Sequence, residues 1–222
     1  TGPTGHLDVL TGIIDVTTDG AVIENIELYG MINIKANNVT IRNCKIDATG
    51  YFYCIRSNYG FKGLTVEYVE MLNPLADCIV ARDFTIRWCH MYNSHGDAIK
   101  AGSNSNIESN YVHHLGMGED AHADAVQSLG GNNIIIRYNN FDLPVPAQPP
   151  YKANTCFISN PDVTNVLIEG NCLNGGGLTL YTNNNISVID NRFGRDYAFG
   201  VKAGTPALWI NNVWDDTNEI IN

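Results

Sequence analysis

Residues 38–46 read NVTIRNCKI, with apolar or small side chains at places two, four, seven and nine of a nine-residue frame. The same frame recurs along the chain, and successive frames start between 18 and 32 residues apart. It begins again at Gly20, Gly63, Asp83, Asn104, Asn133, Asn165, Asn185 and Pro206. A pattern repeated at this spacing is the sequence signature of a solenoid, in which each repeat stacks on the next.

Two places of the frame are apolar in every repeat. Place four is occupied by Ile23, Ile41, Val66, Ile86, Ile107, Ile136, Ile168, Val188 and Trp209. Place nine is occupied by Leu28, Ile46, Met71, Met91, Val112, Phe141, Leu173, Phe193 and Trp214. Because places two and four alternate with a period of two, we expect them on the inner face of a strand.

Place seven changes character along the chain. It is apolar or cysteine in the first four repeats and then becomes asparagine, at Asn110, Asn139, Asn171, Asn191 and Asn212. Five asparagines at one place predict a stacked ladder of side-chain amides at a turn. Asparagine also tolerates the left-handed backbone that a sharp turn demands.

A second short strand is predicted in each repeat. These strands cover residues 33–36, 53–57, 77–81, 97–101, 124–128, 155–159, 177–181 and 199–203. No segment has helical periodicity, and the spacing typical of leucine-rich repeats is absent. We therefore predict an all-β, right-handed parallel β-helix of about nine coils, formed by residues 1–222 as one domain with residues 1–19 as a lead-in or cap.

Composition excludes some functions. The formal net charge is −10 and 44% of the 222 residues are hydrophobic. An acidic chain is a poor partner for nucleic acid, and it mildly disfavours a polyanionic substrate unless a local basic patch overrides the net value. No apolar run approaches the roughly 20 residues that span a bilayer, and no signal peptide is visible. The six cysteines form no CxxC pair, so we expect small core residues.

Three aspartates begin the second strands of consecutive coils: Asp77, Asp97 and Asp124. Stacked coils would place neighbouring carboxylates roughly 5 Å apart. Repulsion at that distance raises pKa values, so that an acid and a base can coexist. A straight strand would turn Asp124 inward beside Val126, so this site requires the aspartates to lie in the turn that enters the strand. The alternative is that aspartate simply favours that turn.

Two histidines strengthen the column of acids. His95 and His122 each stand two residues before an aspartate, and extended segments would place all four side chains on one face. Such a grid predicts acid–base catalysis, or a divalent cation (calcium or a transition metal) held by His95, Asp97, His122 and Asp124. Hydrogen-bonded structural pairs are the alternative.

Other residues are candidates for substrate contact. Lys100 and Arg56 could neutralise a uronate carboxylate, and Lys100 could also remove a proton. Insertions at residues 116–123 and 142–154 flank the coil of Asp124, as groove walls often do. The remaining candidates for substrate binding are Gln127, Tyr151, Lys152 and Tyr181.

The repeats resemble those of the pectate-lyase-like superfamily over nearly the whole chain. DCIVA at residues 77–81 and DAVQ at residues 124–127 are similar to polygalacturonase stretches that carry catalytic aspartates. The likeness is partial, because Ala76 stands where those enzymes have a first aspartate, Gln127 replaces an acid, and their histidine motif has no clear counterpart. HADAVQ (122–127), LNGGG (173–177), NRFGRDY (191–197) and NNVWDD (211–216) resemble secreted bacterial β-helix proteins of unassigned activity.

The resemblance and the acid column together predict a secreted or extracellular carbohydrate-active protein. A polysaccharide lyase is slightly favoured over a glycoside hydrolase, because two histidines suit metal binding or proton transfer. The alternative is a non-catalytic glycan-binding or structural solenoid, such as a phage tail or surface-fibre module, which the opening TGPTG would suit. We expect a monomer for an enzyme and a trimer for a fibre module.

Overall fold

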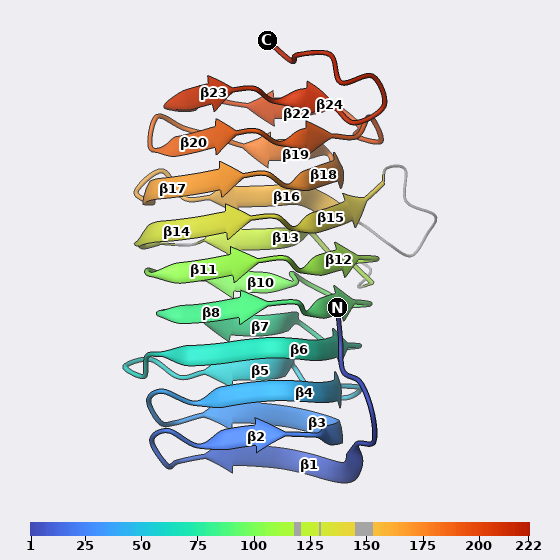
Figure 1. The fold of residues 1–222 in the computed structure, drawn as a ribbon, viewed down its shortest axis with the longest axis vertical. Coiled ribbons are helices and arrows are strands. Elements are labelled where there is room, and N and C mark those ends of the chain that lie inside the picture. The colour runs from blue at the N-terminus through green and yellow to red at the C-terminus, as the bar shows by residue number, and fades with distance from the viewer. Residues whose placement is uncertain (118–120, 129, 145–152) are drawn as a thin grey trace.

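The structure is a computed structural model that describes residues 1–117, 121–128, 130–144 and 153–222. These residues form 24 strands and no helix, so none of them provides a helix that could span a membrane. The strands pair in parallel with the equivalent strands of the neighbouring coils, and the coils stack along one long axis (Figure 1). The predicted all-β parallel β-helix of about nine coils is confirmed.

Three parallel sheets run along the stack. The first sheet carries places two to five and consists of β2 (Val22–Glu24), β4 (Thr40–Asp47), β6 (Leu64–Leu72), β8 (Phe84–Arg87), β11 (Ser105–Glu108), β14 (Asn132–Arg137), β17 (Thr164–Glu169), β20 (Ile186–Ile189) and β23 (Leu208–Ile210). The second sheet carries place nine and continues from β3, β4 and β6 into β9 (His90–Tyr92), β12 (Tyr111–His113), β15 (Asn140–Leu143), β18 (Cys172–Gly175), β21 (Arg192–Phe193) and β24 (Val213–Trp214).

The third sheet contains the predicted second strands. It consists of β1 (Asp8–Val16), β3 (Ile26–Ile34), β5 (Tyr53–Ser57), β7 (Asp77–Ala81), β10 (Ile99–Ala101), β13 (Ala123–Ser128), β16 (Ala153–Ser159), β19 (Leu178–Tyr181) and β22 (Gly200–Ala203). Residues 1–19 include β1, which pairs along its whole length with β3 and so extends the solenoid by one layer.

The core follows the predicted columns. Place-four residues are in register from Ile23 to Trp209, and those from Ile41 to Val188 are at most 1% exposed. Both end residues, Ile23 and Trp209, are only partly buried, because an end coil is covered on one side only. Five cysteines are buried as expected, but Cys172 is exposed. The expectation is wrong there because Cys172 occupies place eight, which faces outward on β18.

The amide ladder is also confirmed. The five asparagines at place seven are 0–2% exposed, and Nδ2 of each of the first four donates to Oδ1 of the asparagine in the next coil at 2.9–3.1 Å. The same oxygen accepts the backbone N–H of the previous asparagine, for example Asn139 N to Asn171 Oδ1 at 2.9 Å. The left-handed residue lies one place earlier, at place six, where φ is 56° at Tyr68 and 57° at Trp88. The asparagines therefore satisfy the backbone beside the turn and do not themselves make it.

Candidate functional site

The outer face of the third sheet is shaped by a break in strand alternation. In β7 both Cys78 and Ile79 are buried, and in β13 both Ala125 and Val126 are buried. Because two successive residues point inward, the aspartate before them and the residue after them lie on the same outer side of the strand. These flanking residues are Asp77 and Val80 in β7, and Asp124 and Gln127 in β13. Contact between Asp124 and Gln127, at 3.3 Å from Oδ2 to Nε2, follows from this break. The expectation that the aspartates lie in the turn before the strand holds for Asp97 alone, because Asp77 and Asp124 belong to β7 and β13, and all three side chains are buried.

Three aspartates form a hydrogen-bonded column across consecutive coils. Asp77 Oδ1 accepts the backbone N–H of Asp97 at 3.0 Å, and Asp97 Oδ1 accepts that of Asp124 at 2.8 Å. Asp124 Oδ1 in turn accepts Thr155 Oγ1 and Asn154 Nδ2, both at 3.0 Å. The three aspartates are 4%, 2% and 1% exposed in chain order. The column is therefore stacked as predicted, but it lies beneath the surface.

Lys100 bridges the first two carboxylates. Its Nζ lies 2.9 Å from Asp77 Oδ1 and 2.9 Å from Asp97 Oδ2. Burial by itself would lower the pKa of Lys100, but the charges of Asp97 and Asp77 outweigh that effect and raise the pKa above its usual value. Lys100 is held as an ammonium ion, so its environment favours a charge-neutralising role over the predicted role of proton-abstracting base.

Asp124 has a different environment from its neighbours. Burial first, and then the charge of Asp97, raises the pKa of Asp124 to about 7, against the opposing hydrogen bonds from Thr155 and Asn154. Burial also raises the pKa of Asp97, although Lys100 opposes that shift. Asp124 therefore carries a proton in part of the population near neutral pH, as a general acid requires.

The predicted grid of two histidines and two aspartates does not form. His95 and His122 are exposed whereas Asp97 and Asp124 are buried. His95 lies in a bend and His122 directly precedes β13, so neither histidine is itself part of a strand. In the described part of the chain, no three histidine, cysteine, aspartate or glutamate side chains have the arrangement of a metal site. The predicted divalent-cation ligand set therefore does not fit, and the Lys100 ammonium is the cation beside Asp97.

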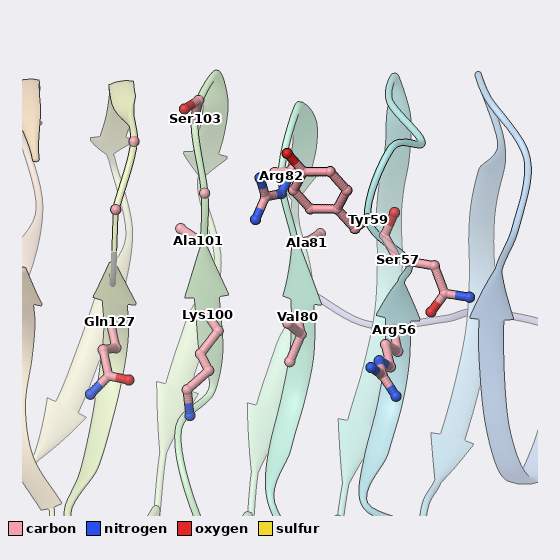
Figure 2. Close-up of a pocket in the computed structure, with 14 residues that line it drawn as sticks. Arg56, Ser57, Tyr59, Val80, Ala81, Arg82, Lys100, Ala101, Ser103 and Gln127 are labelled. Carbon is pink, nitrogen blue, oxygen red and sulfur yellow. The ribbon is translucent and has the colours of Figure 1, made fainter.

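A groove of about 450 Å³ opens beside the column of aspartates on the outer face of the third sheet. Figure 2 shows Arg56, Val80, Lys100 and Gln127 in one row across four neighbouring coils, with Tyr59, Arg82 and Ser103 at one edge. The row arises from strand register, which pairs Arg56 with Val80, Val80 with Lys100, and Lys100 with Gln127. Predicted substrate-binding residues Arg56 and Gln127 thus line one groove together with Lys100.

The other predicted substrate contacts lie elsewhere. Tyr181 is on β19, two coils beyond Gln127, and is not part of the groove lining. Tyr151, Lys152 and most of the predicted wall at residues 142–154 lie outside the described residues, as do residues 118–120 of the other insertion. Sequence reasoning missed Asn154 and Thr155 as partners of Asp124, although Thr155 occupies the next position of the aspartate column. It also missed Tyr59 and Arg82, which the frame places in turns.

Comparison with solved structures supports the fold. A mutant tailspike protein of E. coli bacteriophage HK620 in complex with a pentasaccharide matches with a TM-score of 0.50 and 12% identity, over 87% of this chain and 48% of that one. Another mutant of the same tailspike, also with a pentasaccharide, has a TM-score of 0.50 and 13% identity over the same shares. The chain thus spans about half the length of these solved chains. No protein-family model and no curated protein matches the sequence.

These likenesses bear on the fold alone: the chain is a parallel β-helix protein, and its own structure adds the aspartate column and the groove on the third sheet.

Proposed function

We propose that this protein binds a polysaccharide in the groove of the third sheet and hydrolyses it, with Asp124 as the general acid. The observation that carries the proposal is the buried Asp124 carboxyl group with a pKa near 7, one coil away from a second carboxylate. Support for a saccharide ligand comes from the structural neighbours of this fold that are in complex with a pentasaccharide.

The chemistry divides between neighbouring coils. Protonated Asp124 donates to the leaving glycosidic oxygen, and Asp97, whose Oδ2 lies 2.9 Å from the Lys100 ammonium, is the second carboxylate. Carboxylates in adjacent coils are roughly 5 Å apart, which is the spacing of glycosidases that retain configuration. Gln127 lies between Asp124 and the groove with a long 3.3 Å contact, so the substrate must displace this side chain to reach the acid.

A hydrolase is preferred here over the lyase that the sequence slightly favoured. A lyase needs a base that removes a proton from carbon, and the ion pairs of Lys100 oppose that role. The metal that a lyase could use has no fitting ligand set among the described residues.

A non-catalytic glycan-binding or fibre module is the second candidate. It is favoured by the burial of the aspartates and by the hydrogen bonds that Asp77 and Asp97 accept from backbone N–H groups of the next coil. In that case the role of the column is structural, because it holds neighbouring coils together. Either role implies a secreted or extracellular protein with a polysaccharide partner. Light scattering tests the expected monomer of an enzyme against the trimer of a fibre module.

The deciding experiment compares the native chain with Asp124→Asn on a panel of polysaccharides, measuring reducing ends and unsaturated-product absorbance separately. Asp162→Asn is the matched control, because Asp162 is exposed and outside the groove. We expect reducing ends without unsaturated product, and a loss of roughly 100-fold or more in Asp124→Asn alone. Unsaturated product would identify a lyase, and unchanged cleavage by folded Asp124→Asn would remove Asp124 from the mechanism. Binding without any cleavage would establish the glycan-binding module.

A further inference from the structure

Two arginines of the groove have no acidic partner among the residues that the structure describes. Five of the seven arginines form ion pairs with N–O distances of 2.6–3.3 Å: Arg42, Arg87, Arg137, Arg192 and Arg195. The other two, Arg56 and Arg82, make no ion pair with any described residue, and both line the groove. The chain has 23 acidic against 13 basic residues, so carboxylates are abundant. Unpaired guanidinium groups at one place therefore indicate an anion supplied from outside the chain.

Aromatic rings support both guanidinium groups. The Arg82 guanidinium lies over the Tyr59 ring, 4.5 Å from its centroid, and that of Arg56 lies 5.6 Å from the Tyr53 ring. Contact with a ring face positions the planar group and leaves its in-plane N–H donors free for an oxyanion. Tyr59 is 84% exposed, so its ring is accessible to a ligand in the groove beside Arg82.

The floor between the cations suits a sugar ring. Val80 lies in the row between Arg56 and Lys100, and Ala81 and Ala101 lie between that row and the edge at Arg82 (Figure 2). Lys100 adds no net positive charge, because the two carboxyl groups of Asp77 and Asp97 face its single ammonium group. The free positive charge of the groove therefore resides on Arg56 and Arg82, in adjacent coils about 5 Å apart.

We propose that the ligand of this groove is an anionic polysaccharide whose carboxylate or sulfate groups are bound by Arg56 and Arg82. This inference rests on the proposed function in taking the groove as the glycan site, and it names the class of glycan. Arg82 and Tyr59 are then specificity-determining residues, which act on binding and not on bond cleavage. The local charge overrides the net charge of −10, which by itself disfavours such a ligand.

The test uses pairs of polymers that differ mainly in charge: polygalacturonate against its methyl ester, and dextran sulfate against dextran. Affinities are measured for the native chain, Arg56→Gln, Arg82→Gln and the double variant. Arg137→Gln is the matched control, because Arg137 also lies over a tyrosine, 5.8 Å from the Tyr138 ring, but is paired with Glu108 on another sheet. These side chains are exposed or half-buried, so the variants are expected to fold.

We expect a charged polymer to bind at least tenfold more tightly than its neutral counterpart. Each groove variant should lose roughly tenfold in affinity, with a weaker dependence on salt, whereas the control should not change. Whichever of the two charged polymers, polygalacturonate or dextran sulfate, binds more tightly indicates whether the groove prefers carboxylate or sulfate groups. Equal or tighter binding of the neutral polymers, or unchanged binding by the double variant, would overturn the inference. If cleavage of a neutral polymer depended on Asp124 but not on the arginines, the proposed function would stand without it.

Discussion

Replacement of one ladder asparagine should destabilise the solenoid strongly. Asn171 is fully buried, and its Nδ2 donates to Ile136 O and to Asn191 Oδ1, both at 2.9 Å. Its Oδ1 accepts the backbone N–H of Asn139 at 2.9 Å and Asn139 Nδ2 at 3.0 Å. Asn171→Leu is similar in size but removes all of these side-chain contacts.

The expected cost follows from the groups left without partners. Asn139 N–H loses its acceptor and Ile136 O loses a donor, whereas Asn139 Nδ2 keeps its bonds to Ile107 O and Arg137 O. An unsatisfied buried polar group costs about 1–3 kcal/mol, so two such groups cost about 2–6 kcal/mol. The added apolar burial of leucine offsets part of this, and we expect a net loss of about 3 kcal/mol. For a domain of this size, that lowers the melting temperature by roughly 6–12 °C.

Urea unfolding followed by circular dichroism and tryptophan fluorescence measures this loss. Asn165→Leu is the control, because Asn165 also donates to an asparagine of the neighbouring coil, Asn133, at 2.7 Å but is exposed. Asn165 has φ of 54°, so leucine there adds backbone strain of roughly 1–2 kcal/mol and makes the comparison conservative. If Asn171→Leu is no less stable than Asn165→Leu, the buried ladder does not stabilise the fold as argued.

Two further predictions concern the aspartate column. The pKa of Asp124 rises from 3.8 to about 7 on folding, so its stabilising effect is complete below pH 4 and lost as pH rises through 7. The unfolding free energy should therefore fall by up to about 4 kcal/mol from pH 4 to 8 in the native chain and much less in Asp124→Asn; equal slopes in urea titrations would contradict this. Lys100→Met should cost about 2–4 kcal/mol at pH 7, because two carboxylates stay buried without a counter-ion. Lys35→Met, which breaks an exposed pair with Asp15, should cost under about 1 kcal/mol, and a similar loss in both variants would argue against the bridge.

The architecture could be predicted because the same pattern of apolar residues recurs in the sequence of every coil. Places four and nine must face inward in each turn, and neighbouring coils must then pair like with like, so Ile86, Ile107 and Ile136 stack in register. The same logic identified the column of Asp77, Asp97 and Asp124. It did not identify the left-handed residue, because tyrosine and tryptophan occupy place six in some coils and their propensities oppose that backbone.

The sequence by itself thus determined the stacking of the coils, the inward columns, the amide ladder and the row of acids, since each depends on positions that repeat along the chain. Only the tertiary structure decided which of those acids holds a proton and which charges remain free. The pKa of Asp124 depends on burial, on Asp97 in the coil before it and on Asn154 and Thr155 in the coil after it. That Arg56 and Arg82 pair with no acid in the described part of the chain is likewise a property of their neighbours in space. Such environments arise from single residues contributed by different coils, and no repeat in the sequence specifies them.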